Sequence, residues 1–168
     1  MNVTETERLR LRWMHAGDAP FILELVNEPG WIRYIGDKNV RSVEDAQRYI
    51  ENGPAKMYRD AGFGLNLVEL RNGEAIGMCG LIRRDTLPDA DLGFALASRA
   101  WGRGYAFEAA AAAMRHARAS LGQQRIVAIV ANGNDRSVRL LDKLGFAFED
   151  MVQLAPDAEP LQLFASSR

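Results

Sequence analysis

The sequence of 168 residues is poor in several features, and each shortage excludes a class of protein. There is one cysteine, Cys79, so no internal disulfide can form and no zinc site can rest on thiolates. No hydrophobic run approaches the roughly 18–20 residues of a membrane span, and the first residues lack the apolar segment of a signal peptide. We therefore predict a cytoplasmic protein with no metal site and no membrane partner.

Charge of one sign is also not in excess. Lys and Arg number 21 and Asp and Glu number 22, which gives a net charge of −1. A protein that neutralises many phosphates needs a basic excess, so we expect no nucleic-acid partner. The sequence is 48% hydrophobic and 26% charged, which is typical of a globule with a sizeable core and excludes disorder. At roughly 100–200 residues per domain, residues 1–168 are expected to form one domain.

The first part of the chain predicts a strand followed by two helices. Residues 9–13 alternate leucine or tryptophan with arginine, which is the period of a strand with one buried face. Asp18, just before a proline, marks the start of a helix. Ser42 begins a second helix because Asp45 follows three residues later, as in a capping box. Gly53-Pro54 is expected to stop or kink that helix.

A meander of three strands is predicted next. Asn72-Gly73 lies between the strand-like runs 65–70 and 75–82, and Asn-Gly between two such runs is the strongest short signal for a hairpin. Pro88 lies in a second turn, and residues 91–96 form the third strand of the meander.

The second half alternates helices and strands. Residues 104–121 hold five consecutive alanines and form the clearest helix, followed by a buried strand at 125–130. A strand, a helix and a strand in this order suggest a parallel pair. A short helix at 137–144 and strands at 146–154 and 161–165 complete the chain. The predicted class is α+β, with a mixed sheet of about six to seven strands and about four helices.

The stretch Trp101-Gly102-Arg103-Gly104-Tyr105-Ala106 lies between a predicted strand and the longest predicted helix. A helix start offers free backbone N–H groups and the positive end of the helix dipole. Glycines let that backbone approach an anion closely. The stretch therefore predicts a phosphate or pyrophosphate site, although glycines that only serve a tight loop would give the same local pattern.

Two common phosphate-binding loops do not fit this stretch. A Walker loop needs Gly-Lys followed by Ser or Thr, which is absent here. The dinucleotide fingerprint needs a third glycine where Phe107 stands, and a carboxylate after the following strand, where the sequence has Asn132. Both alternatives therefore fail at named positions.

The stretch resembles the acetyl-CoA pyrophosphate loop of the GNAT acetyltransferase superfamily, [Q/R]-x-x-G-x-[G/A]. Gly104 and Ala106 match its fixed positions, and Trp101 replaces the usual Gln or Arg, a departure typical of the ribosomal-protein N-acetyltransferase (RimJ/RimL-like) branch. The resemblance covers nearly the whole chain, because three further segments look like that branch in the same order: Glu7–Arg12, Asp91–Phe94 and Asn134–Phe146. It implies the GNAT fold.

The resemblance also implies acetyl-CoA as co-substrate and a gap between the strands 91–96 and 125–130. The pantetheine arm would pair with the backbone of the first of these strands, and the pyrophosphate would lie on the glycine loop. The implied cofactor-binding residues are Phe94, Ala95, Leu96, Trp101, Gly102, Arg103, Gly104, Tyr105, Ala106, Asn134 and Ser137.

The implied reaction moves an acetyl group to an amine, so it needs a base for the amine and an acid for the thiolate. Asp91, at the start of its strand, is the predicted base, and Glu108 is the second candidate, although a carboxylate there also suits the helix dipole. Many family members place a tyrosine near the thiolate, and Leu141 holds that position here. Ser137 is therefore the predicted acid, while Asn134 or Ser137 could instead serve only as a helix cap.

The remaining chemically active side chains carry no motif. His15 and His116 are not expected to act as bases, and Cys79 is predicted to be part of the core. We predict an N-acetyltransferase that acts on a primary amine, first on the N-terminal α-amine of a protein or peptide. A small-molecule amine acetyltransferase and a non-catalytic acyl-CoA-binding module are the alternatives, and the protein is expected to be a monomer or a homodimer.

Overall fold

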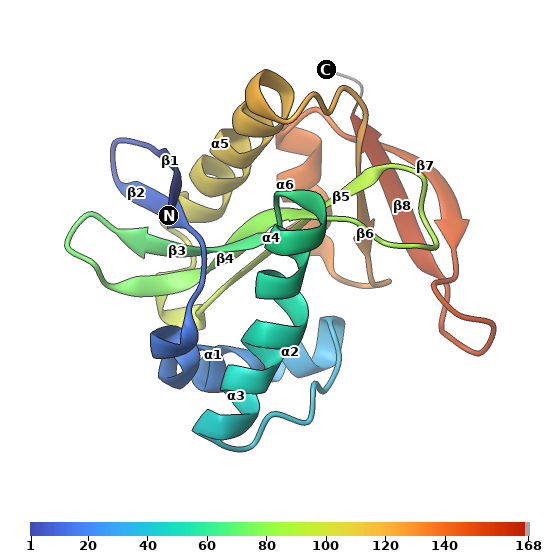
Figure 1. Cartoon of the computed structure of the whole chain (residues 1–168). Helices are drawn as coiled ribbons and strands as arrows, with labels where there is room; N and C mark the ends of the chain where they lie inside the picture. The colour runs from blue at the N-terminus through green and yellow to red at the C-terminus, as the bar shows by residue number, and fades with distance from the viewer. Residues whose placement is uncertain (167–168) are drawn as a thin grey trace.

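A computed structural model describes residues 1–166 of the chain (Figure 1). Its strands are β1 (Asn2–Glu5), β2 (Leu9–Arg12), β3 (Leu65–Leu70), β4 (Ala75–Ile82), β5 (Ala90–Leu96), β6 (Ile126–Val130), β7 (Ala147–Val152) and β8 (Leu161–Ser166). Its α-helices are α1 (Ala19–Val26), α2 (Pro29–Tyr34), α3 (Val43–Ile50), α4 (Lys56–Ala61), α5 (Tyr105–Ser120) and α6 (Asp135–Lys143).

All eight strands belong to one mixed sheet, in the order β1-β2-β3-β4-β5-β6-β8-β7. Neighbours are antiparallel except β5 and β6, which are parallel because α5 connects them by a crossover. The predicted meander is confirmed: β3 pairs with β4 and β4 with β5, and Asn72-Gly73 makes the first of its turns.

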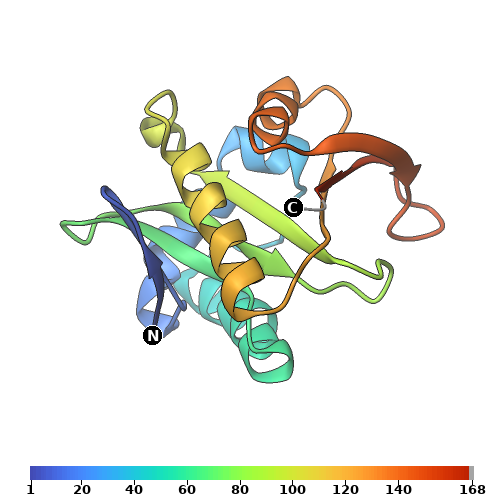
Figure 2. The ribbon, with the colours of Figure 1, turned by 90° about the horizontal axis from the view of Figure 1, so that it is seen from above.

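Helices cover both faces of the sheet and form two cores. On one face α5 packs its alanines on β4 and β5, and Leu141 of α6 joins the same buried cluster. On the other face α1, α2 and α3 contribute to a second cluster that includes Ile22, Trp31 and Ile50. Figures 1 and 2 show α5 lying across the sheet opposite these three helices. The α+β class is confirmed.

The number of elements is higher than predicted. The sheet has eight strands instead of about six to seven, because β1 (sequence NVTE) is a polar edge strand with no alternating apolar pattern. Six α-helices replace about four, because α2 is a six-residue helix with one fully packed side chain, Trp31. Gly53-Pro54 does not end the helix before it: the backbone widens into a π-helical turn over Glu51–Ala55 and continues as α4.

Ser42 acts as predicted at the start of α3, since its hydroxyl accepts a hydrogen bond from the Asp45 N–H at 3.0 Å. Asp18 makes no side-chain cap for α1, because its carboxylate accepts from the His15 N–H and from Arg12. Among the α-helices of residues 1–166, none combines the length and the hydrophobicity needed to cross a bilayer.

Candidate active site

The sheet opens between β5 and β6. These strands pair at only two positions, Ala90 with Ile126 and Asp91 with Val127. Beyond Asp91, no strand within residues 1–166 pairs with the β6 side of β5, although β4 pairs with its other side as far as Leu96. The backbone of Phe94, Ala95 and Leu96 therefore lies at an open edge to which an extended, amide-bearing chain can add.

The glycine loop lies at the end of this open edge and leads into α5. Gly102 and Gly104 have φ angles of 78° and 81°, which favour glycine. Gly104 is the N-cap of α5 and offers no side chain to the first-turn N–H groups, including that of Tyr105. A Cβ on Gly102 would meet nothing within 4 Å, and one on Gly104 only Arg8, at 3.4 Å. This arrangement is an open cradle for an anion.

Two arginines that the sequence did not single out contact this loop. The Arg8 guanidinium donates to the backbone carbonyl of Arg103 at 3.0 Å and lies over the Tyr105 ring, 4.5 Å from its centroid. Arg136, in the first turn of α6, stacks on the Trp101 ring at 4.2 Å. Together with the exposed Arg103 they add positive charge around the cradle. Sequence spacing could not find them, because Arg8 and Arg136 reach the loop from β2 and α6.

Trp101 ties the loop to the open edge. Its indole N–H donates to the carbonyl of Leu96 at 2.9 Å, and the residue is 41% exposed. Because Arg136 stacks on the same ring, Trp101 joins the first predicted cofactor segment to the second. The predicted loop residues and the start of α6 therefore lie together.

The start of α6 separates the two roles that the sequence left open for Asn134 and Ser137. Asn134 is the N-cap, and its side-chain oxygen accepts from the Ser137 N–H at 3.3 Å. The Ser137 hydroxyl has no hydrogen-bond partner among residues 1–166 and is half-buried. Leu141, one turn later on the same helical face, is fully buried in the core.

Asp91 lies where the two parallel strands part. It is 1% exposed, and its Oδ2 accepts from Arg84 Nε at 2.7 Å, while Oδ1 has no hydrogen-bond partner. Burial raises the pKa of Asp91 to about 6, although Arg84 and the nearby Ile129 N–H act in the opposite direction. A carboxylate with such a pKa is partly protonated near pH 6 and can exchange a proton near neutral pH.

Glu108 is occupied by the N-terminal strands. Its carboxylate accepts from the Thr6 hydroxyl, from the Arg8 N–H at 3.1 Å and from Arg8 Nε at 2.8 Å. Burial raises its pKa, but these hydrogen bonds and the Arg8 charge outweigh that effect and lower it. The carboxylate fastens the turn between β1 and β2 to the first turn of α5.

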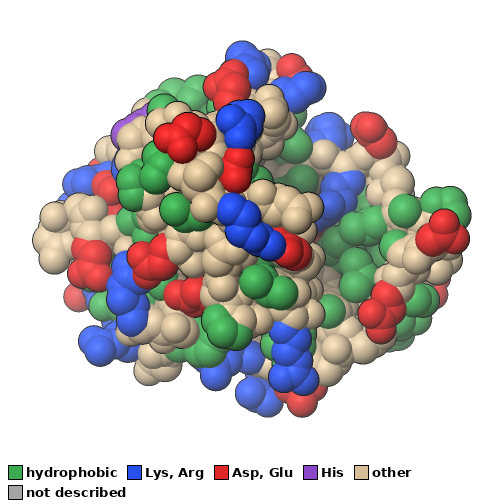
Figure 3. All heavy atoms as spheres, turned by 90° about the horizontal axis from the view of Figure 1, so that it is seen from below, with side chains coloured by type: hydrophobic (Ala, Val, Ile, Leu, Met, Phe, Trp, Pro, Cys, Tyr) green, Lys and Arg blue, Asp and Glu red, His purple; other side chains and the backbone are tan. Residues whose placement is uncertain are grey.

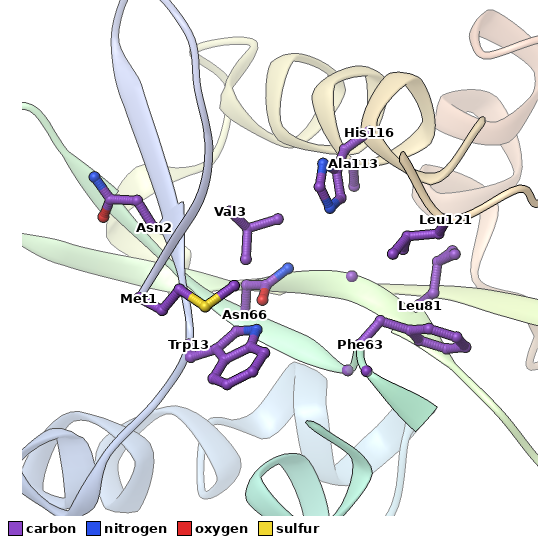
Figure 4. A pocket seen from close by; sticks show the side chains of 13 residues that line it. Met1, Asn2, Val3, Trp13, Phe63, Asn66, Leu81, Ala113, His116 and Leu121 are labelled. Carbon is purple, nitrogen blue, oxygen red and sulfur yellow. The ribbon is translucent and has the colours of Figure 1, made fainter. Parts of the chain in front are cut away.

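The histidines and the cysteine lie apart from the glycine loop. His15 accepts from the Gly17 N–H and so caps the short turn before α1. His116, on α5, lines a small pocket with Asn66 and Trp13 (Figure 4), and none of the predicted cofactor or catalytic residues lines that pocket. Cys79 is fully buried, as predicted, and burial raises its pKa to about 12.

The split mixed sheet and the glycine cradle at the start of the crossover helix can be compared with known families. A family model described as "Acetyltransferase (GNAT) domain" matches residues 8–147. The chain belongs to the GNAT acetyltransferase family.

Curated proteins and solved structures agree with this assignment. The chain is 29% identical over 152 residues to the uncharacterized N-acetyltransferase YoaA of Bacillus subtilis (strain 168), covering 90% of this chain and 86% of that protein. An acetyltransferase from Agrobacterium tumefaciens str. C58 has a TM-score of 0.84 at 24% identity, covering 100% and 95% of the two chains. RimL, a ribosomal L7/L12 alpha-N-protein acetyltransferase solved with coenzyme A, has a TM-score of 0.84 at 18% identity, covering 99% and 98%. These structural likenesses support the fold.

Proposed function

We propose that this protein transfers an acetyl group from acetyl-CoA to a primary amine. The observation that carries the proposal is the open cradle at the start of α5, next to the unpaired edge of β5. A GNAT family member with that pair of features has a place for a pyrophosphate and a place for an amide-bearing arm. YoaA is named an N-acetyltransferase, and RimL was solved with coenzyme A, which supports the same cofactor here.

In this proposal the pyrophosphate lies on the backbone of Trp101–Ala106, with Arg8, Arg103 and Arg136 around it. The pantetheine arm follows the open edge at Phe94–Leu96 and passes Asn134. Backbone N–H groups at a helix start bind an anion without the desolvation cost of burying a charged side chain. The residues present therefore fit coenzyme A by charge and by space.

The chemistry is a direct transfer. The amine nitrogen forms a bond to the thioester carbonyl carbon, a tetrahedral oxyanion follows, and the carbon–sulfur bond breaks. The proton lost by the amine passes to Asp91, through a water because Asp91 is buried. The leaving thiolate accepts a hydrogen bond from the Ser137 hydroxyl, or a proton that Ser137 regains from solvent while Asp91 releases the proton taken from the amine. No covalent enzyme intermediate is needed, which is consistent with the full burial of Cys79.

The leading acceptor is the N-terminal α-amine of a protein or peptide, and the likeness to RimL supports it. A small-molecule amine is the second candidate. The test is thiol release from acetyl-CoA with a panel of N-terminal peptides and small amines. Because Cys79 is buried with a raised pKa, a thiol reagent added to the folded enzyme reports the released coenzyme A.

The cofactor site is tested separately with Gly104→Glu. A side chain and a negative charge in the cradle are expected to abolish coenzyme A binding measured by calorimetry. Gly122→Glu is the matched control, because Gly122 also has a positive φ (68°) and open space around it but lies at the other end of α5. Unchanged affinity in a folded Gly104→Glu protein would place the cofactor elsewhere. Binding without transfer to any amine would favour a non-catalytic acyl-CoA-binding module.

A further inference from the structure

The side chain of Arg84 is directed to Asp91 and fastens no other segment. Arg84 lies in the connection between β4 and β5, and its Nε donates to Asp91 Oδ2 at 2.7 Å. This contact is the only hydrogen bond and the only ion pair that the Arg84 side chain forms with residues 1–166. The side chain is 34% exposed and belongs to neither core. Its role in the protein is therefore to be sought at the carboxylate of Asp91.

The contact uses one oxygen of that carboxylate. Arginine often binds a carboxylate through two parallel hydrogen bonds, which occupy both oxygens. Here Asp91 Oδ1 is buried and has no hydrogen-bond partner within the described part of the chain. Arg84 thus fixes the orientation of the carboxylate through Oδ2, while the lone pairs of Oδ1 stay available for a hydrogen bond or a proton.

The surroundings of Asp91 make this ion pair effective. The residues opposite Asp91 in the two neighbouring strands are Ile82 of β4 and Val127 of β6, and both are apolar. Asp91 itself is 1% exposed. Charges interact more strongly where water and counter-ions are excluded. Loss of the Arg84 charge is therefore expected to change the proton affinity of Asp91 substantially.

Arg84 is the charged side chain that acts on Asp91. Burial raises the pKa of Asp91, and Arg84 and the Ile129 N–H act in the opposite direction. Burial and the charge of Arg84 lower the pKa of Lys38, but Lys38 does not act on the pKa of Asp91. Within residues 1–166, Arg84 is thus the cation whose removal should be visible at Asp91.

The carboxylate lies where the two parts of the sheet diverge, since β5 and β6 pair only as far as Asp91 and Val127. Figure 3 shows a hollow between the main body of the molecule and the part at the right of the view, where Figure 1 places β7 and β8. Hydrophobic side chains gather on its floor. The surface is therefore hollowed between the same two parts of the sheet, as the approach of an acceptor to the gap between β5 and β6 requires.

We propose that Arg84 is a positioning residue for acetyl transfer, which holds Asp91 through Oδ2 and keeps it ionised so that Oδ1 takes the proton of the amine. The inference rests on the proposed function and assigns a further residue to it. The proton leaves the amine nitrogen, passes through a water to Oδ1, and is released to solvent when Asp91 ionises again. Arg84 neither gains nor loses a proton, because a guanidinium stays protonated.

The experiment replaces Arg84 and follows Asp91 by two independent measurements. The pKa of Asp91 is measured by NMR titration of its carboxyl carbon, whose signal is assigned by its loss in Asp91→Asn. The pH profile of kcat/KM is measured by thiol release with one amine, so that the titration of the acceptor cancels between proteins. Arg83→Gln is the matched control, because Arg83 is an exposed arginine of the same connection and lies over the Phe63 ring.

Arg84→Gln is expected to raise the pKa of Asp91 from about 6 by about 1–2 units and to move the rise of kcat/KM by the same amount. At pH 7 this shift lowers kcat/KM about 2- to 10-fold, and the loss is recovered near pH 9. Arg84→Lys keeps the charge but loses the fixed Nε–H, so a smaller shift is expected. Arg83→Gln is expected to match the wild type in both measurements.

The failures are distinguishable. A pKa of Asp91 that stays unchanged in Arg84→Gln, or a loss of kcat/KM that is equal at every pH in the folded variant, would overturn the role of Arg84 and leave the acetyltransferase proposal intact. If Arg84→Gln does not fold, an unshifted profile in Arg84→Lys with reduced kcat/KM at every pH decides against the role in the same way. Tight coenzyme A binding without thiol release to any amine would overturn the transferase proposal, and the role of Arg84 with it, even where the pKa of Asp91 shifts.

Discussion

At the scale of single residues, Asp91 combines burial with a partner that only partly neutralises it. Asp91→Asn keeps the shape of the side chain and removes the charge, so turnover is expected to fall by about 10²–10⁴-fold. In the wild type, kcat/KM is expected to rise as the pH increases through about 6, where Asp91 loses its proton. The variant is expected to lack this rise.

The same substitution has a consequence for stability, whose sign follows from the raised pKa of Asp91. Between its ordinary value of 3.8 and about 6, the folded state binds the proton more tightly than the unfolded state. The free energy of unfolding therefore falls as the pH rises through this interval, and Asp91→Asn is expected to remove that slope. Asp85→Asn, an exposed residue of the same connection, is the control. Full turnover with an unchanged pH profile in Asp91→Asn would move the base to another group.

Ser137 and Asn134 offer a second residue-scale prediction. Ser137→Ala is expected to lower kcat with little change in melting temperature or coenzyme A affinity, because its hydroxyl caps nothing. Asn134→Ala is expected to cost about 0.5–2 kcal/mol of stability, because it removes the cap of α6. Thermal unfolding and steady-state kinetics on both variants separate the two roles. A less stable but fully active Ser137→Ala protein would contradict the proposed role of the hydroxyl.

The glycine loop could be predicted from the sequence because its signal is local: two glycines of positive φ before a helix rich in alanine. Arg84 could not, because its significance depends on the pairing with Asp91 across a turn, which no periodic pattern encodes. Arg136 was likewise hidden, since its stacking on Trp101 joins segments more than 30 residues apart in the sequence. Residues that act through tertiary contacts need the fold before they can be recognised.

At the scale of elements, Glu108 links α5 to the N-terminal strands. Glu108→Gln is expected to lower the free energy of unfolding by about 1–3 kcal/mol, since it weakens charged hydrogen bonds to Thr6 and Arg8. Because the folded state lowers the pKa of Glu108, this stabilisation is present above the unfolded pKa and is lost as the pH falls through the folded pKa. Chemical denaturation at several pH values measures it.

Glu44→Gln is the control for this change. Glu44 lies in the first turn of α3, as Glu108 does in α5, but it is exposed and forms no ion pair among the described residues. Equal losses of stability would mean that the helix dipole alone explains Glu108. A large loss of kcat in Glu108→Gln at unchanged coenzyme A affinity would instead support a part in proton transfer.

The predicted element boundaries agree with the structure where a helix cap or a turn has a specific sequence signal. Ser42 and Asn72-Gly73 carry such signals, and the structure places a helix start and a hairpin turn there. The strand β1 and the π-helical turn at Gly53-Pro54 carry none, because each depends on neighbours: β1 on pairing with β2, and the turn on the packing of buried Pro54.

At the scale of the whole molecule, the sheet consists of two parts: the five strands β1–β5, and the three strands β6, β8 and β7. The two parts meet only along a short seam, the pairing between β5 and β6. The residues of β5 and β6 pair twice, whereas β4 and β5 pair at six positions and β6 and β8 at five. The resemblance to a known family implied this gap, and the pattern of residues alone did not, because β5 and β6 are both apolar enough for a continuous sheet.

The short pairing between β5 and β6 has a consequence for local unfolding of the protein. The part formed by β6, β8 and β7 can detach locally at less cost than β3 or β4, which pair at four to six positions on each side. In native-state hydrogen exchange, amides of β6 are expected to exchange through smaller openings than those of β4. A ligand that contacts both β5 and β6 would hold the two strands together. Saturating coenzyme A is therefore expected to slow amide hydrogen exchange in both strands. The gap that we propose receives the cofactor is thus also the pair of strands with the fewest hydrogen-bonded positions in the sheet, so the proposed cofactor binding and the local stability of the sheet would depend on the same missing hydrogen bonds.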